Sequence, residues 1–364
     1  MTAQILLRTC LTIAIFWCLD LAVFHTRLYP SIIEPDSTTG NVESRLDNEI
    51  PRATGDRNQV LAVGNSRQAL NARVANALIH ETGYTFASIS VGGTMPRCWY
   101  YQLRAADPTA RRYAAVIIPS DDYDEPDEYD SPVERPVDLN YMLAQLRLGD
   151  VAEFSGSYSA WDARWTIARS IFLKGVVYRR DFQELLLHPA KRFEDIKESR
   201  ENSASWAYTF DGEDETLAGL SVDWANRVIH FSDRVSPETR ERVRIQLLRE
   251  RPPQTGQTTR YCRYWYGRIL DYYRGSGTKV IFMQIPRWPL PIPAFQTHNP
   301  DSAARGCRSN PGAIVLDEHL LEGLERPELF MDEVHLNREG MHRFTGIVAR
   351  EVRRVLGPGH PSED

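Results

Sequence analysis

Hydrophobic residues in this chain recur in short runs that alternate with amphipathic stretches. The apolar runs have the length of buried strands and lie at residues 59–63, 86–93, 113–120, 279–286 and 313–317. Stretches with helical spacing of apolar residues lie beside them, at residues 67–83, 94–107, 261–277 and 339–356. Strands that alternate with helices in this way are typical of a mostly parallel sheet covered on both faces, so the sequence predicts an α/β fold.

The first 29 residues form a separate apolar segment. Between Thr9 and Phe24 the only charged side chain is that of Asp20, and the apolar character begins at Ile5. A membrane-spanning helix needs about 20 predominantly apolar residues, which this segment provides. A cleaved signal peptide and a buried helix of a soluble domain are the alternatives. Large residues follow Phe24, where a cleavage site would have small ones, so we expect residues 1–29 to be an N-terminal transmembrane anchor.

The rest of the chain divides by composition. Residues 30–57 are polar and rich in turn formers, which predicts a stalk, and residues 58–358 contain the alternating pattern. Residues 121–260 interrupt that pattern with an acidic run at 121–130 and with helical stretches. This large insertion is either a solvated loop with a helical cap or a cap that shapes a substrate groove. The aromatic side chains available for such a groove are those of Trp161, Trp165, Trp206 and Trp224.

Charge and cysteine content exclude several classes of protein. The 364 residues carry 43 Lys and Arg against 49 Asp and Glu, and this net charge of −6 argues against nucleic acid as a partner. No CxxC pair and no clustered His and carboxylate pattern is present, so we expect neither a metal nor another cofactor. Outside the anchor, Cys262 and Cys307 form a disulfide, or they and Cys98 are three unpaired buried thiols; both interpretations stay open.

Ser66 is the first candidate catalytic residue. It lies in the sequence Gly64-Asn65-Ser66, between the first predicted strand and the helical stretch that follows it. Ligands of open α/β sheets bind at the carboxyl edge of the strands, and a helix N-terminus there would stabilise a developing negative charge. A serine at this point is also a common helix N-cap with no further role.

Asp332 and His335 supply the chemistry that a nucleophilic serine requires. They are three residues apart in the sequence LFMDEVHLNREG, so both side chains are able to face one site across a turn. An imidazole accepts the hydroxyl proton near neutral pH. A carboxylate bound to its other ring nitrogen fixes the tautomer and stabilises the imidazolium. On its own the DxxH spacing is a weak signal.

These segments together resemble the SGNH (GDSL-like) hydrolase superfamily. The Gly64-Asn65-Ser66 sequence is similar to the first block of that superfamily, with Asn65 where Asp is usual. Gly92-Gly93 is similar to the second block, and the segment from Asp332 to His335 is similar to the last. The resemblance covers both ends of the domain and leaves the insertion unexplained.

The resemblance implies both a fold and a set of roles. The fold is a flavodoxin-like three-layer sandwich, to which the chain adds the helical insertion and the N-terminal helix. Ser66 is the implied nucleophile, His335 the base and Asp332 its orienting partner. The backbone N–H of Gly93 is the implied oxyanion donor, together with that of Ser66.

One block departs from the superfamily pattern. Members usually carry GxND after the third strand, and the Asn side chain donates to the oxyanion. Here the corresponding residues are Ser120, Asp121 and Asp122, with Asp121 in the position of that Asn. An ionised aspartate only accepts hydrogen bonds, so the third donor comes from Ser120, from the insertion, or from nowhere.

The resemblance and the anchor together suggest a function. The chain looks like the membrane-anchored members of the superfamily, such as the DltD and alginate acetylation proteins. We therefore expect a serine-dependent esterase or O-acyltransferase outside the cytoplasm, held by one membrane helix and acting on esters of a cell-envelope polysaccharide. The alternative is a non-catalytic envelope assembly or polysaccharide-binding protein that retains the fold.

Overall fold

The computed structural model describes residues 2–53, 58–120, 134–203, 216–248, 256–290 and 301–358. The chain forms two compact units. Unit 1 contains the described residues 2–48 and 134–203, and unit 2 contains the described residues 49–53, 58–120, 216–248, 256–290 and 301–358. Both units are therefore built from segments that are distant in the sequence.

A five-stranded sheet forms the centre of unit 2. Its strands are β1 (Gln59–Ala62), β2 (Thr85–Ser88), β3 (Ala115–Ser120), β6 (Lys279–Gln284) and β7 (Ala313–Val315). The strand order is β2-β1-β3-β6-β7, and every neighbouring pair is parallel. All five carboxyl ends therefore lie at one edge of the sheet. The predicted α/β fold with a mostly parallel sheet is confirmed: four of the predicted runs contain a strand, and the run at 86–93 overlaps β2, which begins one residue earlier.

Helices and a small ribbon complete unit 2. The helices are α3 (Ala72–Asn76), α4 (Ile79–Thr82), α5 (Pro96–Ala106), α12 (Pro237–Leu248), α13 (Gln257–Tyr272), α14 (Ala303–Gly306) and α15 (Arg338–Leu356). Short 3-10 helices lie at Ile50–Arg52, Cys307–Ser309, Glu322–Leu324 and Pro327–Leu329. An antiparallel ribbon pairs β4 (Ser221–Asp223) with β5 (Val228–His230).

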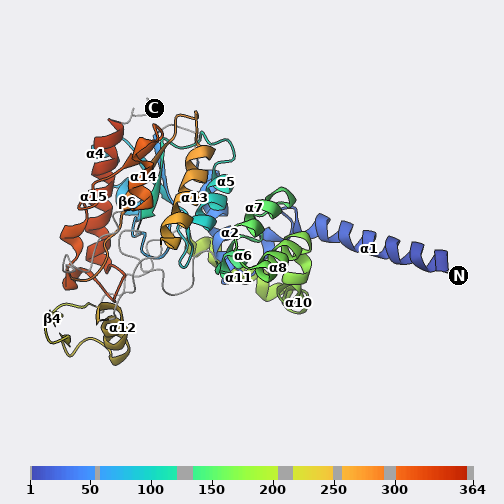
Figure 1. Ribbon diagram of the computed structural model, residues 1–364, viewed down its shortest axis with the longest axis horizontal. Helices are drawn as coiled ribbons and strands as arrows, with labels where there is room; N and C mark the ends of the chain where they lie inside the picture. Colours follow the sequence, from blue (N-terminus) through green and yellow to red (C-terminus); the bar gives the residue numbers. More distant parts are fainter. Residues whose placement is uncertain are drawn as a thin grey trace. The chain divides into compact units, whose positions relative to one another are not determined.

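The two faces of the sheet pack against different helices, because successive side chains of a strand point to opposite sides. Val60 and Ile281 share an apolar cluster with Phe344 of α15. Phe282, the next residue of β6, packs instead against Tyr266 of α13, with ring centroids 4.9 Å apart. All five side chains are fully buried. The positions of α13, α15 and β6 can be followed in Figure 1.

Unit 1 is helical in the part that the structure describes. Its helices are α1 (Thr2–Phe24), α2 (Thr38–Glu49), α6 (Val137–Met142), α7 (Val151–Gly156), α8 (Trp161–Phe172), α9 (Lys174–Val177), α10 (Arg179–Leu187) and α11 (Pro189–Ser203). Short 3-10 helices lie at Pro30–Ile32 and Leu148–Asp150. The segment predicted to be a polar stalk thus contains α2, whose Val42 and Leu46 are completely buried. Residues of the predicted insertion are divided: 134–203 belong to unit 1 and 216–248 to unit 2.

The N-terminal helix α1 differs from all other described helices. Its residues Gln4–Phe24 are long and apolar enough to cross a membrane, and no other helix among the described residues meets that criterion. Most of its side chains are exposed, for example Leu7 at 70% and Ile13 at 63%. A helix that is apolar all round and uncovered by protein is typical of a membrane span.

The three cysteines of unit 2 form no disulfide. Cys98, Cys262 and Cys307 are buried thiols, so the predicted Cys262–Cys307 disulfide is wrong and the alternative of three buried thiols is confirmed. The Cys307 thiol instead donates to the carbonyl oxygen of Ala303 at 3.4 Å. A buried thiol behaves as a small apolar side chain, which suits all three positions.

Gly340 fixes the start of α15, the helix that follows the Asp332–His335 segment. Its N–H donates to the side-chain oxygen of Asn337 at 3.0 Å, and Asn337 is the N-cap of the helix. A Cβ at position 340 would overlap the backbone carbonyl oxygen of Leu329. Glycine is therefore required here by the close approach of two backbone segments.

We expect Gly340→Ala to lower the free energy of unfolding by roughly 2–3 kcal/mol, because neither backbone segment is able to move without disrupting the helix start. The matched control is Gly346→Ala in the same helix. There the new Cβ meets only the flexible end of Arg350, at 3.1 Å, and alanine favours the helix over glycine. Thermal unfolding followed by circular dichroism measures both variants. Equal melting temperatures for the two variants would contradict this account of Gly340.

Candidate active site

Ser66 lies in a turn just beyond the carboxyl end of β1. Asn65 forms this turn: its side-chain oxygen accepts the N–H of Arg67 at 3.0 Å, and its carbonyl oxygen accepts the N–H of Gln68 at 3.1 Å. The turn is tightly packed, because a Cβ on Gly64 would lie 2.7 Å from the Cβ of Gln68. Ser66 is therefore held at the edge of the sheet where ligands of parallel sheets bind.

The helix predicted to begin at Ser66 begins six residues later. Helix α3 starts at Ala72, and Asn71 is its N-cap, with a side chain that accepts the N–H of Val74 at 3.2 Å. The prediction that a helix N-terminus lies behind Ser66 is therefore wrong. The alternative in which Ser66 is only an N-cap is wrong for the same reason. The Asn that precedes the alanine of α3 is an ordinary N-cap signal and marks the true start.

Asp332 and His335 lie in the turn between the 3-10 helix at Pro327–Leu329 and α15. One carboxylate oxygen of Asp332 accepts the backbone N–H of Val334 at 2.9 Å and that of His335 at 2.7 Å. These two bonds orient the carboxylate. Its other oxygen lies 2.8 Å from Nδ1 of His335. The predicted pairing of Asp332 with His335 across a turn is thus present in the structure.

Ser66 and His335 meet although 269 positions separate them in the sequence. Nε2 of His335 lies 2.9 Å from Oγ of Ser66. Because the carboxylate of Asp332 only accepts hydrogen bonds, Nδ1 carries the imidazole proton and Nε2 accepts the proton of the Ser66 hydroxyl. The three side chains therefore form the continuous chain of hydrogen bonds that a serine nucleophile, its base and the orienting acid require.

The carboxylate of Asp332 is stabilised in its charged form. Burial alone would raise the pKa of Asp332, but the hydrogen bond and charge of His335 and the two backbone N–H groups outweigh it. The resulting pKa of Asp332 is lower than its ordinary value. An ionised Asp332 is the form that holds the His335 tautomer and stabilises the imidazolium during reaction.

The Gly92–Gly93 segment lies beside Ser66. A Cβ on Gly92 would be 3.6 Å from the Cβ of Ser66, and Gly93 has a left-handed backbone conformation with φ of 76°. Thr94, which is completely buried, fastens this turn: its hydroxyl lies 3.0 Å from the carbonyl oxygen of Gly64. The structure thus brings the second predicted block to the first, through a threonine that the sequence analysis did not single out.

The segment from Ser120 to Asp122, which corresponds to the GxND block, is described only in part. Asp121 and Asp122, which replace the expected Asn and Asp, lie outside the described residues. Ser120 ends β3 and is buried, and its carbonyl oxygen accepts the N–H of Ile285 at 3.2 Å. The described residues therefore place the backbone of β3 next to that of β6 at this edge of the sheet.

Arg67 links the nucleophile turn to the loop after β6. Its guanidinium donates to the carbonyl oxygens of Pro286 at 3.2 Å and Arg287 at 3.3 Å. Arg97, the other arginine beside a predicted oxyanion segment, is completely buried, with its guanidinium 5.4 Å from the centre of the Tyr261 ring.

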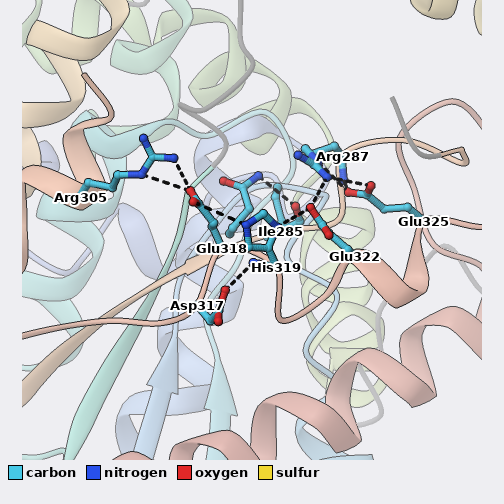
Figure 2. A network of polar contacts seen from close by, with 9 residues as sticks. Ile285, Arg287, Arg305, Asp317, Glu318, His319, Glu322 and Glu325 are labelled. Atoms are coloured by element: carbon cyan, nitrogen blue, oxygen red, sulfur yellow. Dashed lines mark hydrogen bonds and ion pairs between the residues drawn. The ribbon is translucent and has the colours of Figure 1, made fainter. Parts of the chain in front are cut away.

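A polar network holds that same loop (Figure 2). Arg287 donates from Nε to Glu325 at 2.8 Å and from Nη2 to Glu322 at 2.9 Å. Glu322 also contacts Nδ1 of His319 at 2.7 Å, which raises the pKa of His319. Burial raises the pKa of Glu325, while the pair with Arg287 opposes that rise. Two carboxylates hold the guanidinium of Arg287, so this side chain positions the loop after β6.

No group of three or more metal-ligating side chains occurs among the residues that the structure describes. The Asp332–His335 pair has a third partner in a hydroxyl group, whereas a zinc site would need further nitrogen, sulfur or carboxylate ligands. The arrangement fits acid–base and nucleophilic chemistry.

Comparisons with known proteins add no assignment. No protein-family model matches the chain, and no curated protein matches it in sequence. The resemblance to the SGNH superfamily stays a hypothesis that rests on the motifs.

Proposed function

We propose that this protein is a serine-dependent acyl-ester hydrolase or O-acyltransferase of the SGNH type. The observation that carries the proposal is the chain of hydrogen bonds from Ser66 to His335 and Asp332, at 2.9 and 2.8 Å. Both distances are those of hydrogen bonds, and the tautomer that they imply leaves Nε2 of His335 able to accept the Ser66 proton. The parallel sheet with helices against both faces supports a flavodoxin-like three-layer fold for unit 2.

The geometry supports a two-step reaction. The Ser66 hydroxyl attacks the acyl carbon while its proton passes to Nε2 of His335. The tetrahedral intermediate then releases the alcohol, which takes the proton from the imidazolium and leaves an acyl ester on Ser66. In the second step His335 deprotonates water, or the hydroxyl of an acceptor, which attacks this ester. The Ser66 oxygen then leaves and takes the proton back from the imidazolium, which restores both side chains. Asp332 stays ionised throughout and stabilises the imidazolium.

The oxyanion that forms in each step needs N–H donors. We assign this role to the backbone N–H groups of Ser66 and Gly93, since the Gly92–Gly93 turn lies against the nucleophile. The cellular setting belongs to the same proposal. A single α1 anchor and an extracytoplasmic site suit an enzyme that adds or removes acyl groups on envelope polysaccharide.

A fluorophosphonate probe tests the proposal directly, because it forms a covalent bond only with an activated serine. We expect the full chain to be labelled at Ser66 and the Ser66→Ala variant to be unlabelled. The matched control is Ser309→Ala, which removes an exposed serine from unit 2 and should keep full labelling. A wild-type chain that stays unlabelled would contradict the proposal and favour a non-catalytic binding role.

A further inference from the structure

Unit 1 exposes large apolar side chains beyond those of α1. Five of them lie on the consecutive helices α8 and α9, which we call the α8–α9 face: Trp161, Trp165, Phe172, Val176 and Val177. Trp161 is 77% exposed and Trp165 is 62% exposed. Tryptophan is usually largely buried in soluble domains, so two such side chains one helical turn apart indicate a surface that meets a partner.

The aromatic residues of α8 form one stripe. At 3.6 residues per turn, Trp161, Trp165 and Phe172 point within about 40° of one another around the helix axis. Ile167 and Ile171 occupy the other side of α8 and are buried. The helix is therefore anchored to unit 1 by one apolar face and presents a second apolar face outward.

This face continues directly from α1. The N–H of Gly175 in α9 donates to a carboxylate oxygen of Asp20 in α1 at 2.8 Å. Phe24, at the end of α1, stacks on Tyr178 with ring centroids 6.0 Å apart. A Cβ on Gly175 would lie 2.6 Å from side-chain atoms of both Asp20 and Phe24, so the backbone of α9 packs directly against these two side chains of α1. Val176 and Val177 follow Gly175 and extend the apolar surface outward from the end of the membrane helix.

The length of α1 gives an independent argument. Residues 4–19 are exposed, whereas Asp20 is only 3% exposed because unit 1 covers it. The apolar span Gln4–Phe24 has 21 residues and is about 32 Å long, which matches the hydrocarbon core of a bilayer, about 30 Å thick. The last turn of α1 belongs to that span and contacts α9, so it brings the surface of α8 and α9 to the membrane boundary.

We infer that the α8–α9 face lies in the headgroup region of the bilayer that α1 spans. The occupant of this surface is phospholipid. Tryptophan is enriched at that depth because its ring is apolar and its N–H bonds to water or headgroups. Exposed arginines lie on α8 and at the start of α10, the helix that follows α9, and suit the phosphate groups: Arg169, Arg179 and Arg180. Unit 1 is thus bound to the membrane in two ways: by the spanning helix α1 and by the α8–α9 face.

Spin labels in the full chain test this inference. Cys10 and Cys18 are first replaced by serine, because the other cysteines are buried. Single labels are then placed by Trp165→Cys and Val176→Cys, and the protein is reconstituted in vesicles of phosphatidylcholine and phosphatidylglycerol. The matched control is Ile245→Cys in α12 of unit 2, an aliphatic position that is 51% exposed. A label at Trp17→Cys in α1 reports whether the helix is inserted.

Two collision rates are measured for each label: one with oxygen, which concentrates in lipid, and one with a water-soluble nickel chelate. We expect the ratio of the oxygen rate to the nickel rate to be severalfold higher at positions 165 and 176 than at 245. Adding Trp161→Glu should lower the ratio at 176, whereas adding Ile245→Glu should not. Ratios at 165 and 176 equal to that at 245 would overturn the inference. A water-exposed label at position 17 would overturn it together with its premise. Neither result depends on Ser66, so the catalytic proposal is tested separately.

Discussion

Replacing His335 with alanine is expected to lower kcat for an aryl acetate by about 10^5-fold, because the proposed nucleophile, Ser66, then lacks its proposed base. Nε2 is 2.9 Å from Oγ of Ser66, and no described side chain other than that of His335 is hydrogen-bonded to this hydroxyl. KM should change little, since the imidazole contacts the nucleophile and acts mainly in the transition state. Hydrolysis of p-nitrophenyl acetate by the purified full chain measures both constants.

The matched control for His335→Ala is His319→Ala. His319 also pairs with an acidic side chain, Glu322 at 2.7 Å, but its ring is 65% exposed and lies in the network that holds the loop after β6. That variant should keep most of the activity. A loss of similar size in both variants would show that His335 has no special role.

Replacing Asp332 with asparagine is expected to lower kcat by about 10^4-fold, with the fold intact. The remaining carbonyl oxygen of the amide still accepts the N–H groups of Val334 and His335, as Asp332 does now. The amide nitrogen then faces Nδ1 of His335 and donates to it. This moves the imidazole proton to Nε2, which can no longer accept the proton of Ser66.

Glu333→Gln is the control that isolates this effect. It removes one negative charge from the adjacent residue, whose carboxylate pairs with Arg242 at 3.3 Å. Activity close to that of the wild type is expected there. The double variant of Asp332→Asn with His335→Ala should be no slower than His335→Ala alone, because the two residues act as a unit. Additive losses of kcat in the double variant would contradict the proposal that Asp332 acts through His335.

Local sequence patterns were sufficient for the strands of the sheet. The five apolar runs became the five strands of the sheet, and Gly83 ends α4 in the left-handed conformation that glycine favours. They were insufficient at the Ser66 turn. There the side chain and carbonyl of Asn65 form a turn in place of the predicted first helical turn. A local hydrogen bond to an Asn side chain stabilises a turn in competition with the first helical turn. The spacing of apolar residues does not show which of the two conformations forms.

Residues 30–57, the polar segment after the anchor, also fold differently from what their local sequence predicts. Its composition predicts a stalk, yet Val42 and Leu46 of α2 are completely buried in unit 1. Thr39 of this helix donates to the carbonyl oxygen of Asn140, in a segment about 100 residues later in the chain. Few apolar residues are enough when a distant segment covers them, and composition carries no information about that segment.

The amino-acid sequence alone determined the periodicity of the strands and helices, the apolar length of α1 and the chemical identities of Ser66, Asp332 and His335. These are local properties, since spacing along a few residues fixes which side chains share a face. Only the tertiary structure decided that residues 66 and 335 meet, that β1 lies between β2 and β3, and that Cys262 and Cys307 form no disulfide. Such pairings depend on how distant segments pack around a common core, and that packing is not encoded in the spacing of any one segment.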